Sequence, residues 1–197
     1  MSGEETKRDQ ILDAAGRMFG RYGFRKTSIA DIIRDAGVAR ATVYNHFSTK
    51  EEIFSAVVER EINDVIAKVS TAVMKEASAP DRLRAAVLTH TEEIRNKVNV
   101  YRLTIQSLHE MLPRTHEAAE GMAEEALKIY RWILTEGVKA GEVVVDDIDT
   151  TAWTILLAFK GVFMTTVSGQ IKERMPGVVD RLLEIMWNGL RPREDAR

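Results

Sequence analysis

Apolar residues recur at steps of three and four along almost the whole chain, and this spacing restricts the fold more than any other feature. It is the period of a helix that packs one face against a core. The first run of this kind comprises Ile11, Leu12, Ala15, Met18, Phe19 and Tyr22. No alternation of polar and apolar residues, the mark of a half-buried strand, is long enough to compete, and the one short strand candidate is the valine run at residues 143–145. The pattern predicts an all-α protein of about nine helices.

Glycine and capping residues divide the first third of this pattern into short helices. Gly23 is placed to end the first helix near residue 22, because glycine accepts the positive φ of a C′ position. Thr27 or Ser28 can cap a second helix over residues 28–36, which Gly37 ends. A third helix is predicted over residues 40–47.

A capping box is predicted to begin the long fourth helix, over residues 48–77. In this box the Ser48 hydroxyl accepts from the Glu51 N–H, and the Glu51 carboxylate accepts from the Ser48 N–H. Pro80 suits the first turn of the next helix. With breaks expected at residues 96–99, Pro113, 141–147 and 175–177, the other predicted helices cover residues 82–96, 99–112, 115–140, 148–170 and 177–190.

The charge is distributed unevenly between the start of the chain and the rest. The formal net charge of the 197 residues is −2, which argues against a protein that binds nucleic acid by bulk positive charge. Residues 1–50, however, hold 9 Lys and Arg against 6 Asp and Glu, whereas residues 51–197 hold 19 against 24. The first 50 residues are therefore the part to examine for a polyanionic partner.

Several classes of protein are disfavoured by composition. The chain has no cysteine, so it can form neither disulfides nor thiolate metal sites. The histidines at residues 90, 109 and 116 lack metal-site spacing, and the sequence contains no nucleophile–base pair or glycine-rich phosphate loop. We expect no catalysis, cofactor or metal.

A membrane association is also not expected. The charged residues 1–9 do not resemble a signal peptide. The most apolar stretch, residues 150–169, contains Lys160 and several threonines, so we expect a buried helix there rather than a membrane span. The cytoplasm is the expected compartment, at the nucleoid.

Residues 27–50 have the organisation of a helix-turn-helix. Two short predicted helices meet at a turn of small residues around Gly37, and Val38, Val43 and Phe47 are spaced to pack behind the second helix. The opposite side carries side chains that can face the major groove, where an arginine binds the O6 and N7 atoms of guanine and a threonine meets thymine or phosphate. The exposed set is Arg40, Ala41, Thr42, Tyr44, Asn45 and His46.

The string TSIADIIRDAGVARATVYNHFSTKEEIF resembles the DNA-binding signature of the TetR family of bacterial transcriptional regulators. The matching residues, in order and spacing, are Gly37, Val38, Thr42, Tyr44, His46, Phe47, Lys50 and Glu51. The preceding run ILDAAGRMFGRYGFRKTSI is similar to the usual opening of the family. Ala39 departs from the serine often found there, which removes a capping oxygen worth about 1 kcal/mol. In the rest of the chain the likeness is one of architecture.

The resemblance implies roles for individual residues. Thr42 and Tyr44 would contact phosphate and base edges, and His46 and Lys50 would contact the DNA backbone. Ser28 would hold a phosphate through its hydroxyl and N–H. Two alternatives stay open: Tyr44 could simply pack on the first helix, and Lys50 could form a solvated pair with Glu51. The predicted DNA-binding residues are Ser28, Arg40, Ala41, Thr42, Tyr44, Asn45, His46 and Lys50, with Arg40 and Asn45 discriminating between sequences.

The last two predicted helices carry more apolar residues than one core face requires. The resemblance implies that they pair with a second copy in a four-helix dimer interface. The predicted interface residues are Leu156, Phe159, Phe163, Val179, Leu182, Leu183 and Met186. A thicker core in a monomer is the alternative.

The middle helices would enclose an effector pocket, as the resemblance implies. Methionine and aromatic residues suit an adaptable apolar site, so a hydrophobic effector such as an acyl chain or an aromatic compound is expected. The candidate lining residues are His90, Tyr101, Thr104, His109, Met111, Met122, Tyr130, Trp132, Trp153 and Met164. For each of them, ordinary core packing is the alternative.

The sequence therefore predicts a DNA-binding domain over residues 1–50 and a ligand-binding and dimerisation domain over residues 51–197. The resemblance implies a homodimeric repressor that leaves a palindromic, double-stranded operator when a small hydrophobic effector binds. The alternative is a DNA-bound factor of the same fold that recruits a protein partner.

Overall fold

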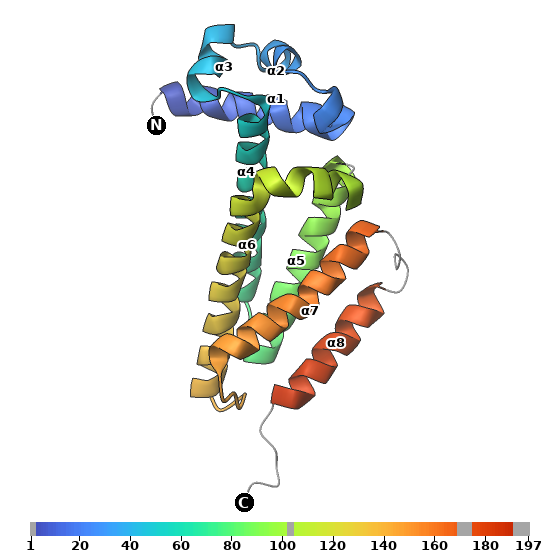
Figure 1. Ribbon diagram of the computed structural model, residues 1–197. Coiled ribbons are helices and arrows are strands. Elements are labelled where there is room, and N and C mark those ends of the chain that lie inside the picture. The colour runs from blue at the N-terminus through green and yellow to red at the C-terminus, as the bar shows by residue number, and fades with distance from the viewer. Residues whose placement is uncertain (1–2, 102–104, 169–174, 191–197) are drawn as a thin grey trace, which may run out of the picture. The chain divides into compact units, whose positions relative to one another are not determined.

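The computed structural model describes the backbone of residues 3–101, 105–168 and 175–190 (Figure 1). These residues form eight helices and no strand, which confirms the all-α prediction with one helix fewer than expected. The helices are α1 (Gly3–Lys26), α2 (Ile29–Ala36), α3 (Arg40–His46), α4 (Lys50–Val73), α5 (Ala79–Tyr101), α6 (Ile105–Lys139), α7 (Ile148–Ser168) and α8 (Met175–Leu190). In the described part of the chain, none of them is long and apolar enough to cross a membrane.

The chain divides into two compact units. The first unit holds residues 1–63 and 96–119, and the second holds residues 64–95 and 120–197. Each unit has its own cluster of buried apolar side chains. The boundary at residue 50 stays a prediction.

The core of the first unit is formed by α1, α2, α3 and the start of α4. Phe19 of α1 lies at its centre and meets Phe54 of α4 edge to face, with ring centroids 5.1 Å apart. Phe24 contacts both of these rings. The fully buried residues around them are Ile11, Leu12, Ile32, Val43, Ile53 and Val57. These are the apolar positions that the helical period places inward.

The helices of this unit begin and end near the glycine and capping residues that predict their bounds. Gly23 interrupts α1 with a φ of +80°, and Gly37 ends α2 with a φ of +64°. Ser28 caps α2 in a capping box with Asp31. Ala39 begins α3 without a side-chain hydrogen bond, as expected from its missing hydroxyl.

The predicted capping box at the start of α4 is displaced by one residue. The Thr49 hydroxyl, not that of Ser48, accepts from a backbone N–H, and the donor is Glu52 at 3.1 Å. The Glu52 carboxylate in turn accepts from the Ser48 N–H at 2.7 Å. Serine and threonine are both preferred N-cap residues, so a Ser-Thr-x-Glu-Glu string offers two possible starts for α4.

Two of the predicted helix breaks are wrong. Helix α5 continues through residues 96–99 to Tyr101, and α6 runs through Pro113 as one helix of 35 residues. Asparagine lowers helix propensity only slightly. A proline removes one backbone hydrogen bond and costs about 3 kcal/mol in a helix interior, which the packing of a long helix can offset. The helices expected over 99–112 and 115–140 are therefore not separate elements.

The core of the second unit is formed by side chains from all five helices α4 to α8. Leu127, Ile133 and Leu134 of α6 are fully buried, as is Ile155 of α7. Gly137 allows α6 to approach α5 closely, because a Cβ there would lie 2.7 Å from the Cβ of Ala79. The Asp147 carboxylate caps α7 by accepting from the Thr150 N–H at 3.1 Å.

Candidate nucleic-acid interface and buried cavity

Helix α3 has one buried side and one exposed side. Val43 and Phe47 are buried in the core of the first unit, and Ile32 of α2 is buried in the same core. Arg40 and Asn45 are exposed on the outside of α3. The remaining predicted DNA contacts on this helix divide into exposed Ala41 and Tyr44 and half-buried Thr42 and His46.

Arg40 and Tyr44 form a pair on the exposed side. The Arg40 guanidinium carbon lies 5.4 Å from the centre of the Tyr44 ring, one helical turn away. Tyr44 is 43% exposed, so a large part of its ring is accessible from outside. A stacked guanidinium keeps its N–H groups directed outward and restricts their motion. This pair can present a rigid fork of donors to a base edge.

Ser28 lies at the start of α2, but its own donors are already used. The Ser28 N–H and hydroxyl both donate to the Asp31 carboxylate, at 3.0 and 2.6 Å. These bonds, the hydroxyl first, lower the pKa of Asp31. A phosphate at this helix end would meet the N–H groups of Ile29 and Ala30, since the first N–H groups of a helix have no acceptor within it. Phosphate binding by Ser28 itself stays a prediction.

Lys50 is held by the backbone of the α1–α2 segment. Its Nζ donates to the carbonyl oxygens of Phe24 at 2.9 Å and Thr27 at 3.0 Å. The ammonium also lies 4.3 Å from the centre of the Phe24 ring. Thr27 is buried, with its hydroxyl 2.9 Å from the Gly23 carbonyl oxygen. Lys50 therefore connects the start of α4 to the segment just before α2 by hydrogen bonds. Contact of Lys50 with a DNA phosphate stays a prediction.

We expect Lys50→Met to lower the free energy of unfolding by about 1.5–3 kcal/mol, the usual worth of a hydrogen bond to a charged group. Methionine keeps the length of the side chain but leaves two carbonyl groups without their donor. Urea denaturation followed by circular dichroism measures the change. Lys26→Met, at an exposed lysine of the same segment, is the control and should stay within about 0.5 kcal/mol of wild type.

Salt dependence of DNA binding separates this structural role from a phosphate contact. A lysine on a phosphate contributes about one unit to the slope of log affinity against log salt. If Lys50→Met lowers that slope by one unit and leaves stability unchanged, the structural role assigned to Lys50 is wrong.

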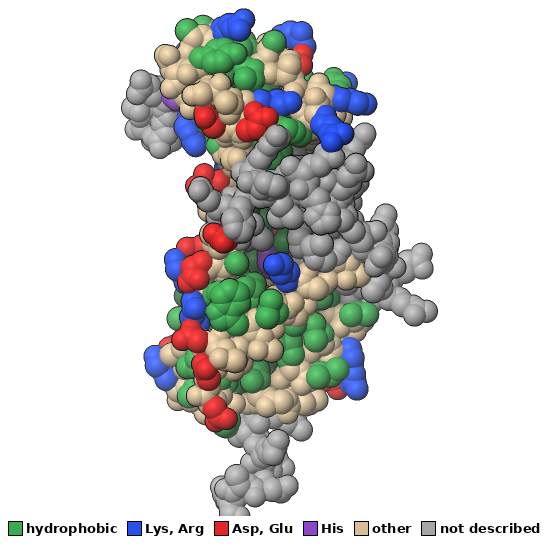
Figure 2. Space-filling view, in the orientation of Figure 1, with side chains coloured by type: hydrophobic (Ala, Val, Ile, Leu, Met, Phe, Trp, Pro, Cys, Tyr) green, Lys and Arg blue, Asp and Glu red, His purple; other side chains and the backbone are tan. Residues whose placement is uncertain are grey.

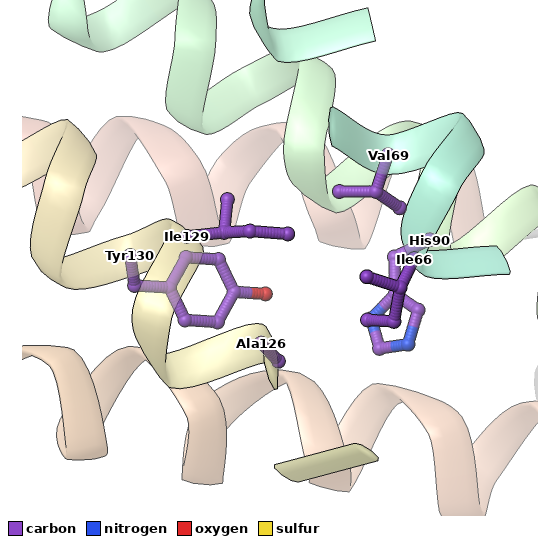
Figure 3. Close-up of a pocket in the computed structure, with 6 residues that line it drawn as sticks. All are labelled: Ile66, Val69, His90, Ala126, Ile129 and Tyr130. Atoms are coloured by element: carbon purple, nitrogen blue, oxygen red, sulfur yellow. The ribbon is translucent and has the colours of Figure 1, made fainter. Parts of the chain in front are cut away.

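A small cavity lies in the core of the second unit, among α4, α5 and α6 (Figure 3). Its volume of about 10 Å³ is close to the least that holds one water molecule. The lining residues are Ile66, Val69, His90, Ala126, Ile129 and Tyr130. Two of them, His90 and Tyr130, are polar, and both are among the predicted effector residues.

His90 and Tyr130 are both held neutral by burial. The His90 side chain is half-buried, but its Nε2 atom is buried and has no hydrogen-bond partner, the one such side-chain atom among the described residues. Burial lowers the pKa of His90 and raises that of Tyr130. In the cavity, His90 shares the lining with Tyr130 and four apolar residues. In each residue the charged form is disfavoured because it would lose its hydration.

The lowered pKa of His90 predicts a loss of stability in acid. The unfolded chain takes up the His90 proton near pH 6.5 and the folded chain only at lower pH, so the free energy of unfolding falls as the pH drops below 6.5. We expect His90→Phe to remove this contribution. Urea denaturation of both proteins between pH 7.5 and pH 5.5 measures it, and equal pH slopes would contradict the assignment.

Two other predicted effector residues, Trp132 and Trp153, do not line this cavity. Trp132 is exposed, and the Arg82 guanidinium lies 4.8 Å from the centre of its ring. Trp153 is also exposed. The predictions for the side chains of Tyr101, Thr104, His109, Met111, Met122 and Met164 lie outside the described residues.

The predicted dimer residues are distributed between core and surface. Phe159, Val179 and Leu183 are buried in the core of their own unit. Leu156, Leu182 and Met186 are half-buried against that core, and the side chain of Phe163 lies outside the described residues. The exposed apolar side chains of these helices are instead Trp153 and Leu157 of α7 and Val178 and Ile185 of α8. Figure 2 shows exposed hydrophobic side chains over this part of the second unit.

Sequence reasoning missed some residues that matter here. Ile66, Val69, Ala126 and Ile129 line the cavity but carry no sign other than the helical period. The carbonyl partners of Lys50 lie 23 and 26 residues before it, so no local sequence motif predicts these hydrogen bonds.

Two family models match the chain. One, described as bacterial regulatory proteins, tetR family, matches residues 11–57, and the other, described as tetracyclin repressor-like, C-terminal domain, matches residues 76–164. The first covers the helix-turn-helix described above, and the second covers α5 and α6, which contribute His90 and Tyr130 to the cavity.

Two relatives match over nearly their whole lengths. The fatty acid metabolism regulator protein of Bacillus subtilis is 23% identical over 191 residues, 96% of this chain and 98% of that protein. The HTH-type transcriptional repressor KstR2 of Rhodococcus jostii is 25% identical over 193 residues, covering 92% and 93%.

Solved structures have the same fold. A transcriptional regulator from Cytophaga hutchinsonii superposes with a TM-score of 0.79 at 20% identity, covering 93% of this chain and 98% of that one. FadR from Bacillus subtilis, in complex with stearoyl-CoA, gives 0.70 at 24% identity, covering 92% and 98%. The helix-turn-helix, the helical second unit and the two family models agree: this chain belongs to the TetR family of bacterial regulatory proteins and is a DNA-binding transcriptional regulator.

Proposed function

We propose that the protein is a homodimeric repressor that binds a palindromic operator through α2 and α3 and leaves it when an apolar effector enters the second unit. The observation that carries the DNA-binding part is the exposed Arg40–Tyr44 pair on a helix whose other side is locked by Val43 and Phe47. Fixed donors on an exposed helix are what reading of the major groove requires. Such a regulator acts in the cytoplasm, where the chromosome lies.

A second copy of the chain is supported by the apolar surface of α7 and α8. Leu157 and Ile185 are 60% and 58% exposed, and Trp153 and Val178 lie exposed on the same two helices. We propose these four residues as the centre of a two-fold interface, in which the same surface of each copy meets the other. A dimer also places two α3 helices on one operator, which a palindrome requires.

An apolar effector is supported by the walls of the cavity and by two relatives. The Bacillus subtilis FadR structure contains stearoyl-CoA, and KstR2 of Mycobacterium tuberculosis is described as a ketosteroid transcriptional regulator. Ile66 and Val69 belong to α4, so an effector that widens the cavity would shift this helix, whose first residue is Lys50. We propose that this shift changes the spacing of the two α3 helices and so releases the DNA.

The test is selection of genomic DNA fragments on the purified protein, followed by binding assays with the selected site. We expect an inverted repeat, and we expect acyl-CoA or steroid compounds to weaken its binding by fivefold to about 150-fold, the usual range of allosteric coupling. Selection of fragments without a common sequence would contradict the proposal.

Recruitment of a protein partner remains the second candidate, and the small size of the described cavity favours it. It predicts that no apolar compound changes operator affinity, while the operator-bound protein retains a specific partner from the lysate.

A further inference from the structure

The cavity of the second unit contains an unsatisfied polar atom in apolar surroundings. His90 Nε2 is buried without a hydrogen-bond partner. Its neighbours from α4 and α6 are aliphatic, apart from Tyr130. A buried polar group without a partner is unfavourable and rare in folded proteins. A ligand that forms a hydrogen bond with His90 Nε2 would remove this cost.

The Tyr130 hydroxyl points into the same cavity, toward the side where His90 lies (Figure 3). His90 comes from α5 and Tyr130 from α6, so the two polar groups approach from different helices. A phenol donates one hydrogen bond, and a neutral imidazole offers one N–H donor and one acceptor. Together they can bind an oxygen atom placed between them.

The cavity offers no charge to balance an anion. Its lining in the described structure contains no lysine or arginine, and both polar residues are neutral. A carboxylate would lose its hydration there without gaining a cation. A ketone, ester or alcohol oxygen needs only the hydrogen bonds that Tyr130 and His90 supply.

We infer that His90 and Tyr130 form the polar subsite of the effector pocket and select an apolar molecule that carries a neutral carbonyl or hydroxyl oxygen. This inference rests on the proposed function, because it assigns the chemistry of the effector. The cavity has room for about one water molecule, so the oxygen of the ligand would fill it and the apolar part would displace the aliphatic side chains around it.

The probes are three nine-carbon compounds that differ in the polar end: 2-nonanone, 1-nonanol and nonanoate. Titration calorimetry of the full-length protein measures their affinities. We expect the ketone and the alcohol to bind at least about tenfold more tightly than nonanoate at pH 7.5. In protein labelled with ¹⁵N-histidine, we expect the Nε2 resonance of His90 to shift when the ketone or the alcohol binds.

Tyr130→Phe removes a single oxygen atom and leaves the cavity apolar. We expect it to weaken 2-nonanone and 1-nonanol binding by about fivefold to tenfold, the effect of one neutral hydrogen bond. His90→Phe should weaken both ligands similarly, and it should raise the melting temperature of the free protein because an unpaired polar atom is removed. Tyr22→Phe, at an exposed tyrosine of α1, is the matched control and should change neither affinity nor stability.

Three results would overturn the inference: no binding of the ketone or the alcohol, nonanoate binding as tight as theirs, or unchanged ligand affinity in both Tyr130→Phe and His90→Phe. Operator binding without ligand is measured in parallel, and it should be the same in all of these variants. A wild-type protein that binds no specific DNA contradicts the proposed function. Specific DNA binding with release by nonanoate alone contradicts only the assignment of His90 and Tyr130.

Discussion

Leu157→Glu is expected to separate the dimer and to lower operator affinity by about 100-fold or more. The side chain is 60% exposed on α7 in the single chain and lies at the centre of the proposed two-fold interface. A glutamate there would place two like charges in an apolar contact, and losing the second half-site removes the gain from simultaneous binding, which is about 10²–10⁴. Sedimentation equilibrium gives the mass, and fluorescence anisotropy gives the affinity.

Met74→Glu is the matched control for this change. Met74 is 70% exposed just after α4, outside the proposed interface, so a glutamate there should leave both mass and affinity unchanged. If Leu157→Glu sediments as a dimer with the wild-type affinity, then Leu157 is not part of the interface. A monomeric variant that keeps full affinity would show that one α3 helix is enough for the operator.

Arg40→Ala is expected to remove most discrimination between the operator and unrelated DNA at the bases that Arg40 reads. A bidentate arginine contact is worth about 1–3 kcal/mol, so operator affinity should fall by about fivefold to 150-fold per half-site. Affinity for unrelated DNA should change much less. The exposed guanidinium lies over the Tyr44 ring and is absent from the core, so the melting temperature should stay the same.

Arg40→Lys separates the charge of this residue from its geometry. Lysine retains the positive charge but cannot form the paired donors of a guanidinium. We expect DNA binding by Arg40→Lys to depend on salt as it does in wild type, but to discriminate less between the operator and unrelated DNA. If Arg40→Lys and Arg40→Ala both bind the operator as wild type does, then Arg40 does not read bases, and Asn45 is the next residue to test.

The first unit could be predicted well because its signals are local. Gly37 requires a left-handed conformation, Ser28 precedes a capping partner, and Val43 and Phe47 have the spacing of a buried helix face. These residues place α2 and α3 within one residue of the predicted bounds. The role of Lys50 could not be predicted in this way, because its partners are brought to it only by packing of α1 against α4.

The second unit was predicted less well because composition does not say which face of a helix meets which neighbour. Composition predicts Trp132 and Trp153 as aromatic lining residues, yet both are exposed. The apolar excess of the last two helices suggests Phe159 and Leu183 as interface residues, yet both lie in the core of their own unit. The helical period identifies apolar faces, and only the packing of several helices decides whether such a face is core, cavity or surface.

Hydroxyl-radical footprinting of the selected operator tests the central claim most directly, namely that two copies of α3 read one palindromic site. A dimer bound in this way protects two short stretches related by symmetry, with centres about 10 base pairs or a multiple of that apart. Arg40→Ala should weaken both stretches equally, and Leu157→Glu should abolish both at the concentration that protects with wild type. A single protected stretch, or protection spread evenly over any DNA, would contradict the account.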